Sequence, residues 1–356
     1  MNLWCATVPG LATMHASLGV SADDPLEVEL GQAMCSLAAA KWAPGSLEQY
    51  AGAFRRFESW CAERTPPRRA LPADAETVAL YMMFLTRHAN TFSVVKTASA
   101  AIAAVHRLNL SPTAPTSHPL VCLVRDGAQA VLGGRLVNQK DALDFEVLRK
   151  AALKASGSDD FMLRYSVTAA LVAFCCFLRY SDLAILTARD VKFLDGHMEL
   201  FLEQRKNDQL REGSVVVVHE GCTGACPVWW MKWWYREMDL DPTSETPVFQ
   251  RYNGRVTRFR ADRCKETMGG QSAPYHQVRS MVLKLLAGEL GMPLEVVEKR
   301  FGTQSLRSGG ATLVAAEGVS DRMFQRHGGW RSAEVKDRYV KDTLQAKLAV
   351  TAMMHY

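Results

Sequence analysis

The stretch QSLRSGGATLVAAEGVSDRMFQRHGGWRSAEVKDRYVKD (304–342) carries most of the information about this protein. It places Arg307 at the start of a helix of small residues, Trp330 after a Gly-Gly turn, and Tyr339 in the short segment that follows. Trp330 lies 23 residues after Arg307, and Tyr339 lies 9 residues after Trp330. Trp330 alone would be typical of a protein core, so the interpretation depends on the three residues together.

A second stretch, CCFLRYSDLAIL (175–186), supplies another arginine at the end of an apolar helix. The two stretches resemble the C-terminal motifs of the tyrosine recombinase (phage integrase-type) family. Their style is closest to Cre-like recombinases and to the recombinases of eukaryotic mobile elements, including the DIRS type. In layout the likeness covers residues 29–350, but its specific motifs are confined to 175–186 and 301–342. It implies an enzyme that breaks and rejoins DNA strands.

The resemblance implies a role for each motif residue. Arg179 and Arg307 are the catalytic arginines, whose planar, always-charged donors match the oxygens of a phosphodiester under attack. Asp182 stands in place of the family's usual glutamate. Tyr339 is the nucleophile, and its attack gives a 3′-phosphotyrosyl linkage.

Two further positions complete the motif. Trp330, directly after Gly329, stands where the family has His or Trp, and its indole N–H can donate to a phosphate oxygen. Gln304 stands three residues before Arg307, where histidine is usual. Glutamine can hydrogen-bond a phosphate oxygen but cannot exchange a proton near neutral pH as imidazole can. We therefore expect lower strand-cleavage activity. Gln304 by itself does not indicate an inactive enzyme.

The family also carries a mobile lysine on a β-hairpin. The strand-like runs HMELFL (197–202) and SVVVVH (214–219) are joined by a polar turn, which predicts such a hairpin. Lys206, in this turn, is the expected general acid for the departing 5′ oxygen. Arg205 is an adjacent competitor and a candidate DNA contact. This chemistry requires no metal and no nucleotide cofactor.

The whole chain reads as two domains. Its 356 residues, 48% of them hydrophobic, suffice for two ordinary cores. Residues 1–24 show no sustained period and are expected to form a loose lead-in. Residues 25–134 are expected to form a helical SAM-like core-binding domain, and 135–356 an α+β catalytic domain. The resemblance implies a mainly α fold with a small β-hairpin or sheet, closing on DNA as a C-shaped clamp.

Apolar residues at intervals of three or four predict most of the helices. The clearest begins at Ser46, which has capping-box spacing with Gln49. Others are predicted after Asp74 and over 93–108, 120–132, 144–155 and 161–178. The helix at 93–108 is rich in small residues, and Lys96 lies away from its apolar side. Lys96 is the candidate DNA contact of the first domain.

The charge distribution favours a nucleic-acid partner. The net charge is +5, but residues 1–40 carry four acidic side chains and no Lys or Arg. That stretch is therefore −4 and the remaining chain is +9. The basic part is the part expected to touch phosphates.

Nine cysteines give an odd count in a chain much larger than disulfide-stapled scaffolds, which favours reduced thiols. Cys222 and Cys226, with His219 before them and Cys264 beyond, raise the alternative of a zinc site. A two-pair ligand pattern is missing, so packing in a turn is the preferred interpretation and no metal is expected.

A membrane or secreted location is not expected. The longest apolar run, Val167 to Leu178, is well short of the roughly 20 residues of a membrane span. The N-terminus lacks the positive region of a secretory signal, since the first basic residue is Lys41. We expect an intracellular protein, nuclear if it comes from a eukaryote and otherwise in the cytoplasm or nucleoid.

The resemblance further implies double-stranded DNA as partner and a tetramer on that DNA. Family members exchange a C-terminal segment between neighbours, and residues 343–354 could serve or could pack on their own domain. Three functions stay open. They are a site-specific recombinase or integrase, a catalytically silent DNA-binding protein derived from one, and a type IB topoisomerase.

Overall fold

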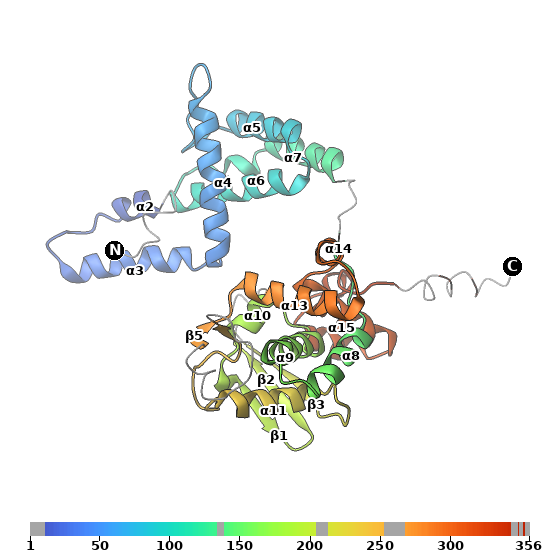
Figure 1. The fold of residues 1–356 in the computed structure, drawn as a ribbon. Coiled ribbons are helices and arrows are strands. Elements are labelled where there is room, and N and C mark those ends of the chain that lie inside the picture. The colour runs from blue at the N-terminus through green and yellow to red at the C-terminus, as the bar shows by residue number, and fades with distance from the viewer. Residues whose placement is uncertain are drawn as a thin grey trace. The chain divides into compact units, whose positions relative to one another are not determined.

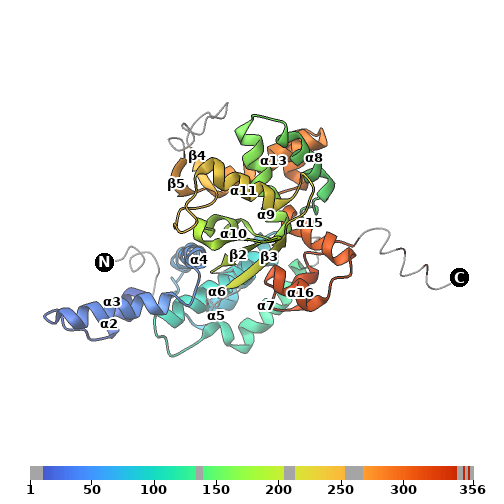
Figure 2. The same ribbon diagram turned by 90° about the horizontal axis from the view of Figure 1, so that it is seen from below.

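The computed structural model describes residues 11–133, 139–203, 213–252 and 268–342, together with Leu348 and Ala352 (Figures 1 and 2). The chain divides into two compact units, Met1–Val137 and Asn138–Tyr356. Each unit has a hydrophobic core of its own.

The first unit is helical in its described part. Its elements are α2 (Leu11–Ser17), α3 (Pro25–Ala39), α4 (Pro44–Ala62), α5 (Ala75–His88), α6 (Phe92–Leu108), a 3₁₀ turn (Pro115–Ser117) and α7 (Pro119–Leu132). Helix α4 packs on α6, and α5 lies beside α7 (Figure 1). Aromatic residues fill the core between them, with Phe57 and Trp60 of α4 against Tyr81 of α5. The helices predicted in this part of the sequence are confirmed.

Two details of the first unit differ from the sequence-based expectation. The lead-in predicted over 1–24 contains a helix, α2, because Leu11 is buried against α3 in a small cluster of its own. Helix α4 begins at Pro44 and not at Ser46, with Ala43 as its N-cap. The fixed φ of proline suits the first helical turn, where its missing N–H is not needed.

The second unit is built around α9 (Phe161–Cys175), whose FMLRYSVTAALVAFC sequence is apolar on nearly all sides and buried. Four helices pack on it: α8 (Phe145–Ser156), α11 (Pro227–Met238), α13 (Tyr275–Leu290) and α15 (Thr303–Ala316). The other helical elements are α10 (Tyr180–Ile185), a 3₁₀ turn (Ala188–Asp190), α14 (Leu294–Arg300), α16 (Asp321–Gly328) and α17 (Ala333–Asp337).

A small antiparallel sheet completes the unit. It has the order β1-β2-β3, formed by Val191–Leu194, His197–Leu202 and Ser214–His219, and a separate pair joins β4 (Gln250–Tyr252) to β5 (Met268–Ser272). The predicted hairpin is confirmed, with Leu200 opposite Val216 and both side chains buried. Strand β1 was not predicted from the sequence. The hairpin turn at 204–212, with Arg205 and Lys206, lies outside the described residues.

Helix α9 ends three residues before the predicted end at Leu178. Phe177 has a φ of 50°, in the left-handed region that few side chains adopt, and the N–H of Leu178 donates to the carbonyl of Ala173 at 2.9 Å. This arrangement is a Schellman-type ending, usually made by glycine. It turns the chain away from the helix axis so that Arg179 starts the next helix.

Close packing explains the Gly-Gly pair in α15. A Cβ on Gly309 would lie 2.2 Å from the carbonyl oxygen of Leu143, and one on Gly310 would lie 2.2 Å from that of Phe174. Backbone atoms cannot yield as a flexible side chain can. Only glycine therefore allows α15 to approach α9 and the segment before α8 this closely.

Gly310→Ala is expected to lower the free energy of unfolding by about 1–3 kcal/mol through overpacking. The matched control is Gly288→Ala in α13, where a Cβ would meet nothing within 4 Å. There alanine is expected to raise the stability by roughly 0.5–1 kcal/mol, because it costs less backbone entropy than glycine. Urea denaturation of both variants measures the two effects, and changes of the same sign would contradict the packing argument.

Candidate active site

Arg179 is positioned by a local cap. It is the N-cap of α10, and its backbone N–H donates to the carboxylate of Asp182 at 2.9 Å. The same carboxylate lies 3.9 Å from Nη1 of Arg179. The side chain of Asp182 is 1% exposed and that of Arg179 is 11% exposed. Asp182 therefore fixes the backbone of Arg179 and faces its guanidinium.

The side chain of Arg307 is fixed by burial and by hydrogen bonds to two backbone carbonyls. It lies in the first turns of α15 and is wholly buried. Its Nη1 donates to the carbonyl of Phe177, and its Nη2 donates to the carbonyl of Gly328 at 2.7 Å. Backbone carbonyls orient a guanidinium without cancelling its charge. The carbonyls of Phe177, which follows α9 in a left-handed conformation, and of Gly328, the last residue of α16, thus orient the guanidinium of Arg307 in the site.

Trp330 and Tyr339 pack on that cation. Gly329 ends α16 with a φ of 61°, which directs Trp330 back toward α15. The guanidinium carbon of Arg307 lies 4.6 Å from the ring centre of Trp330 and 4.7 Å from that of Tyr339. The two rings lie 5.4 Å apart. The three residues of the 304–342 motif therefore meet in space.

The phenol of Tyr339 is electrostatically activated. Burial by itself raises its pKa, but the charges of Arg179 and Arg307 oppose this, together with hydrogen bonding to the side chains of Arg179 and Gln304. The net result is a pKa of Tyr339 below its ordinary value. Gln304 thus lies beside the phenol of Tyr339. A lowered pKa favours loss of the proton that attack on phosphorus requires.

Arg179→Gln is expected to raise the pKa of Tyr339, because Arg179 exerts the largest of the lowering effects. The phenolate absorbance of each protein, with Tyr339→Phe as the blank, gives the titration curve of this one tyrosine. Burial raises the pKa values of Tyr165, Tyr180 and Tyr235, so these groups titrate later. Arg149→Gln, on the exposed Glu146 pair of α8, is the control and should leave the curve in place. A curve unmoved in Arg179→Gln would contradict this electrostatic account.

Among the buried donors of the site, Nη1 of Arg179 and the indole Nε1 of Trp330 have no hydrogen-bond partner among the described residues. The carboxylate of Asp182, 3.9 Å from that Nη1, is too distant for a hydrogen bond. Leaving a buried donor unpaired costs roughly 1–3 kcal/mol, so such groups usually meet a ligand or water. Two donors beside a tyrosine and a second arginine suit an oxyanion such as a phosphodiester.

Lys336 is a site neighbour that the sequence did not reveal. Its side chain is 8% exposed, pairs with Asp321 of α16 and lies 3.3 Å from the carboxylate of Asp337. Its carbonyl accepts from the N–H of Tyr339 at 2.9 Å. The ion pair with Asp321 holds α17, and with it the tyrosine, against α16. A lysine among the charged residues of AEVKD gave no signal of burial.

The cluster of described residues does not include the other residues singled out in the sequence. Lys206 and Arg205 lie outside the described residues. Lys96 is exposed on α6, in the first unit. Cys222 is exposed and Cys226 is buried at the start of α11, while Cys264 lies outside the described residues. Within the described part of the chain, no group of three or more His, Cys, Asp or Glu residues is arranged to hold a metal ion.

None of the described helices has both the length and the apolar character that a membrane span requires.

Solved structures of DNA recombinases share this fold. The XerH site-specific recombinase bound to palindromic difH substrate, a post-cleavage complex, has a TM-score of 0.57 and 13% identity over 99% of this chain and 91% of that chain. The Tn1549 transposon integrase in complex with transposon right end DNA has a TM-score of 0.56 and 9% identity, over 98% of this chain and 100% of that one. No family model and no curated protein matches the sequence. The chain therefore has the fold of tyrosine recombinases, as the motif resemblance implied.

Proposed function

We propose that this chain is a tyrosine recombinase, a site-specific DNA recombinase or integrase that cleaves and rejoins strands through a 3′-phosphotyrosyl intermediate. The observation that carries the proposal is the meeting of Arg307, Trp330 and Tyr339, with the guanidinium carbon of Arg307 4.7 Å from the phenol ring. The charges of Arg179 and Arg307 also lower the pKa of Tyr339. The fold shared with recombinase structures supports the same assignment. Double-stranded DNA is the proposed partner.

The chemistry follows from the residues. The Tyr339 oxygen attacks the phosphorus, forming a phosphotyrosyl bond as the bond from phosphorus to the 5′ oxygen breaks. The phenol loses its proton in this step, and the 5′ oxygen gains one. The guanidinium groups of Arg179 and Arg307 balance the added charge on the non-bridging oxygens. The unpartnered Nε1 of Trp330 donates to one of them. Rejoining is the reverse reaction with a second 5′ hydroxyl.

Lys206 is the proposed general acid for the 5′ oxygen, on the strength of the motif resemblance alone, and Arg205 is its competitor. Gln304 is proposed to hold the phenol and a phosphate oxygen by hydrogen bonds. Because an amide cannot pass a proton at neutral pH, it does not share in proton transfer as histidine can. Assembly as a tetramer on DNA is part of the proposal.

The direct test is covalent capture. The purified protein is incubated with a pool of nicked random and genomic duplexes, and DNA joined to protein is isolated under denaturing conditions and sequenced. An adduct whose DNA shares a sequence supports a site-specific recombinase and identifies its site. DNA bound without any adduct, even in a Gln304→His variant, would favour the silent DNA-binding protein instead.

A type IB topoisomerase would share the adduct but not the products. It relaxes any supercoiled plasmid, whereas a recombinase gives defined joint molecules between two copies of one site. A plasmid assay with and without the captured site therefore separates these two enzymes. The fold shared with recombinases over nearly the whole chain favours recombination.

A further inference from the structure

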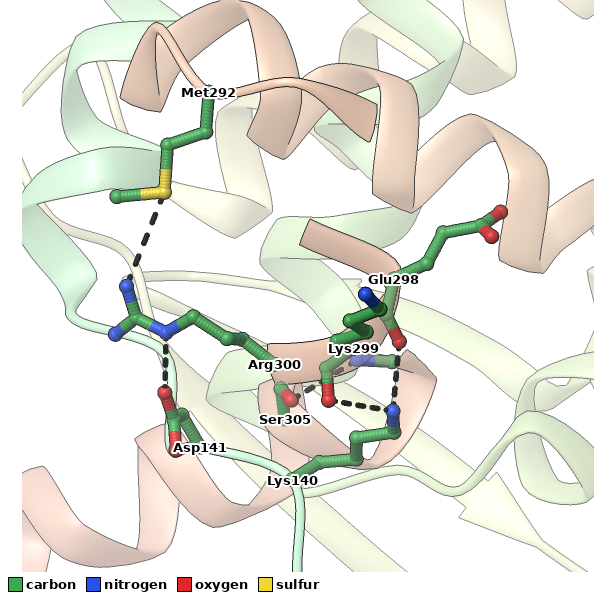
Figure 3. A network of polar contacts seen from close by, with 8 residues as sticks. Lys140, Asp141, Met292, Glu298, Lys299, Arg300 and Ser305 are labelled. Carbon is green, nitrogen blue, oxygen red and sulfur yellow. Dashed lines mark hydrogen bonds and ion pairs between the residues drawn. The ribbon is translucent and has the colours of Figure 1, made fainter. Parts of the chain in front are cut away.

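Residues 139–143 follow the boundary between the two units and are hydrogen-bonded to α14 and α15; we call this segment the strap. Figure 3 shows two of its residues, Lys140 and Asp141. The ammonium group of Lys140 donates to the carbonyls of Glu298 at 2.7 Å and of Lys299 at 2.8 Å. These carbonyls lie at the C-terminal end of α14, where a helix leaves acceptors unpaired and carries partial negative charge. Lys140 is therefore a C-terminal cap supplied from a distant part of the chain.

The strap continues as a second set of bonds along the α14–α15 connection. The N–H of Asp141 donates to the carbonyl of Arg300 at 2.7 Å, and its carboxylate accepts from Nε of Arg300 at 2.8 Å (Figure 3). Further on, the N–H of Leu143 donates to the carbonyl of Ser305 at 3.0 Å. Ser305 lies between Gln304 and Arg307. The strap thus fixes the turn of α15 that carries two of the residues around the phenol.

The strap also contacts the segment that carries Tyr339. The side-chain amide of Gln139 accepts from the ammonium group of Lys341, two residues after Tyr339. The backbone N–H of Lys341 donates to the hydroxyl of Thr312 on α15 at 3.0 Å. The segment that carries the nucleophile and the helix that carries Arg307 are therefore both tied to residues 139–143.

We propose that Gln139, Lys140 and Asp141 are positioning residues that set the separation between Tyr339 and the Gln304–Arg307 turn. They touch neither the phenol nor the arginines in the site, and they act through the carbonyls of α14 and through Lys341. The inference rests on the proposed function and adds residues to it.

The test compares Lys140→Met with Lys154→Met in the full-length protein. Lys154 makes an ion pair at 3.3 Å with Glu289 on the same unit, away from α14 and α15. Small misplacements of reacting groups can cost roughly 100-fold in rate, so we expect single-turnover adduct formation at saturating DNA to fall about 10- to 100-fold in Lys140→Met. The dissociation constant for DNA should stay unchanged. Lys154→Met should match the wild type, and Lys140→Arg should recover much of the lost rate by donating to the same carbonyls.

A second readout does not need activity. Loosening the turn moves Arg307 and Gln304 relative to the phenol, so the phenolate titration of Tyr339 should shift upward in Lys140→Met and not in Lys154→Met. Unchanged cleavage and titration in Lys140→Met would overturn the inference, and so would equal losses in both variants. If the wild type forms no adduct at all, the proposed function fails, and the titration alone still decides whether the strap positions the site.

Discussion

Tyr339→Phe is expected to eliminate covalent DNA capture while leaving the fold and DNA binding intact. Removing the nucleophile from an enzyme that forms a covalent intermediate lowers its rate by roughly 10⁴-fold or more. The phenyl ring keeps the contacts of the phenol ring, which lies 5.4 Å from Trp330 and 4.7 Å from the guanidinium carbon of Arg307. The lost hydroxyl leaves the side chains of Arg179 and Gln304 to solvent or phosphate, which can replace its hydrogen bonds.

The measurement is the yield of DNA-linked protein from nicked duplexes, alongside the dissociation constant for the same DNA. Tyr275→Phe is the matched control, because Tyr275 is half exposed on α13 and outside the site. We expect wild-type yield from the control and none from Tyr339→Phe. Adduct at the wild-type level in Tyr339→Phe would mean that another side chain is the nucleophile.

The motif resemblance identified the residues of the cluster, whereas the backbone that holds them was not predicted. Arg307, Trp330 and Tyr339 were singled out because their order and separations resemble the family motif, and the structure brings them together. The partners of Arg307 could not be found in this way. They are the carbonyls of Phe177 and Gly328, and every residue has a carbonyl. Which one faces a guanidinium depends on the tertiary fold.

The ends of helices show the same limit. The apolar pattern of α9 continues through Phe177 and Leu178, so periodicity predicted a helix to 178. The structure ends it at Cys175 because Phe177 adopts a left-handed conformation that sequence patterns assign to glycine. Arg179 depends on that departure, since a longer helix would place its side chain elsewhere. The tertiary fold therefore overrides the local helix propensity of Phe177 and Leu178, just before Arg179.

Long-range polar contacts could not be predicted from the sequence either. The hydrogen bonds of Lys140 at the end of α14 join positions 158 and 159 residues apart. Lys336 lies among the charged residues of AEVKD (333–337), yet it is buried beside Asp321. Neither has a periodic or spacing signal. The acceptors of Lys140 are backbone carbonyls, which place no demand on the sequence, and the acceptor of Lys336 is a carboxylate on another helix. By contrast, the hairpin was predictable, since two strand-like runs, 197–202 and 214–219, flank a polar stretch.

Arg307→Met is expected to cost both stability and catalysis, and the two losses can be separated. Removing the guanidinium leaves the carbonyls of Phe177 and Gly328 buried without this donor, at a cost of about 1–3 kcal/mol in the free energy of unfolding for each. It also removes a cation from the developing charge on the phosphate. Loss of one such donor lowers rates by roughly 10²–10³-fold. The phenol also loses one of its two activating charges, so its pKa should rise.

The matched control for this variant is Arg164→Met. Arg164 likewise donates to two backbone carbonyls, those of Ala155 at 3.1 Å and Ser156 at 3.3 Å, but it lies on α9 outside the site. Urea denaturation should show a loss of stability in both variants. Adduct formation, measured at a temperature where both proteins remain folded, should fall only in Arg307→Met. A variant with Lys at position 307 keeps the charge but not the two-carbonyl geometry, so an intermediate rate is expected from it. Equal cleavage by Arg307→Met and Arg164→Met would show that Arg307 only supports the fold, and the phosphate clamp would then have to rest on Arg179 alone.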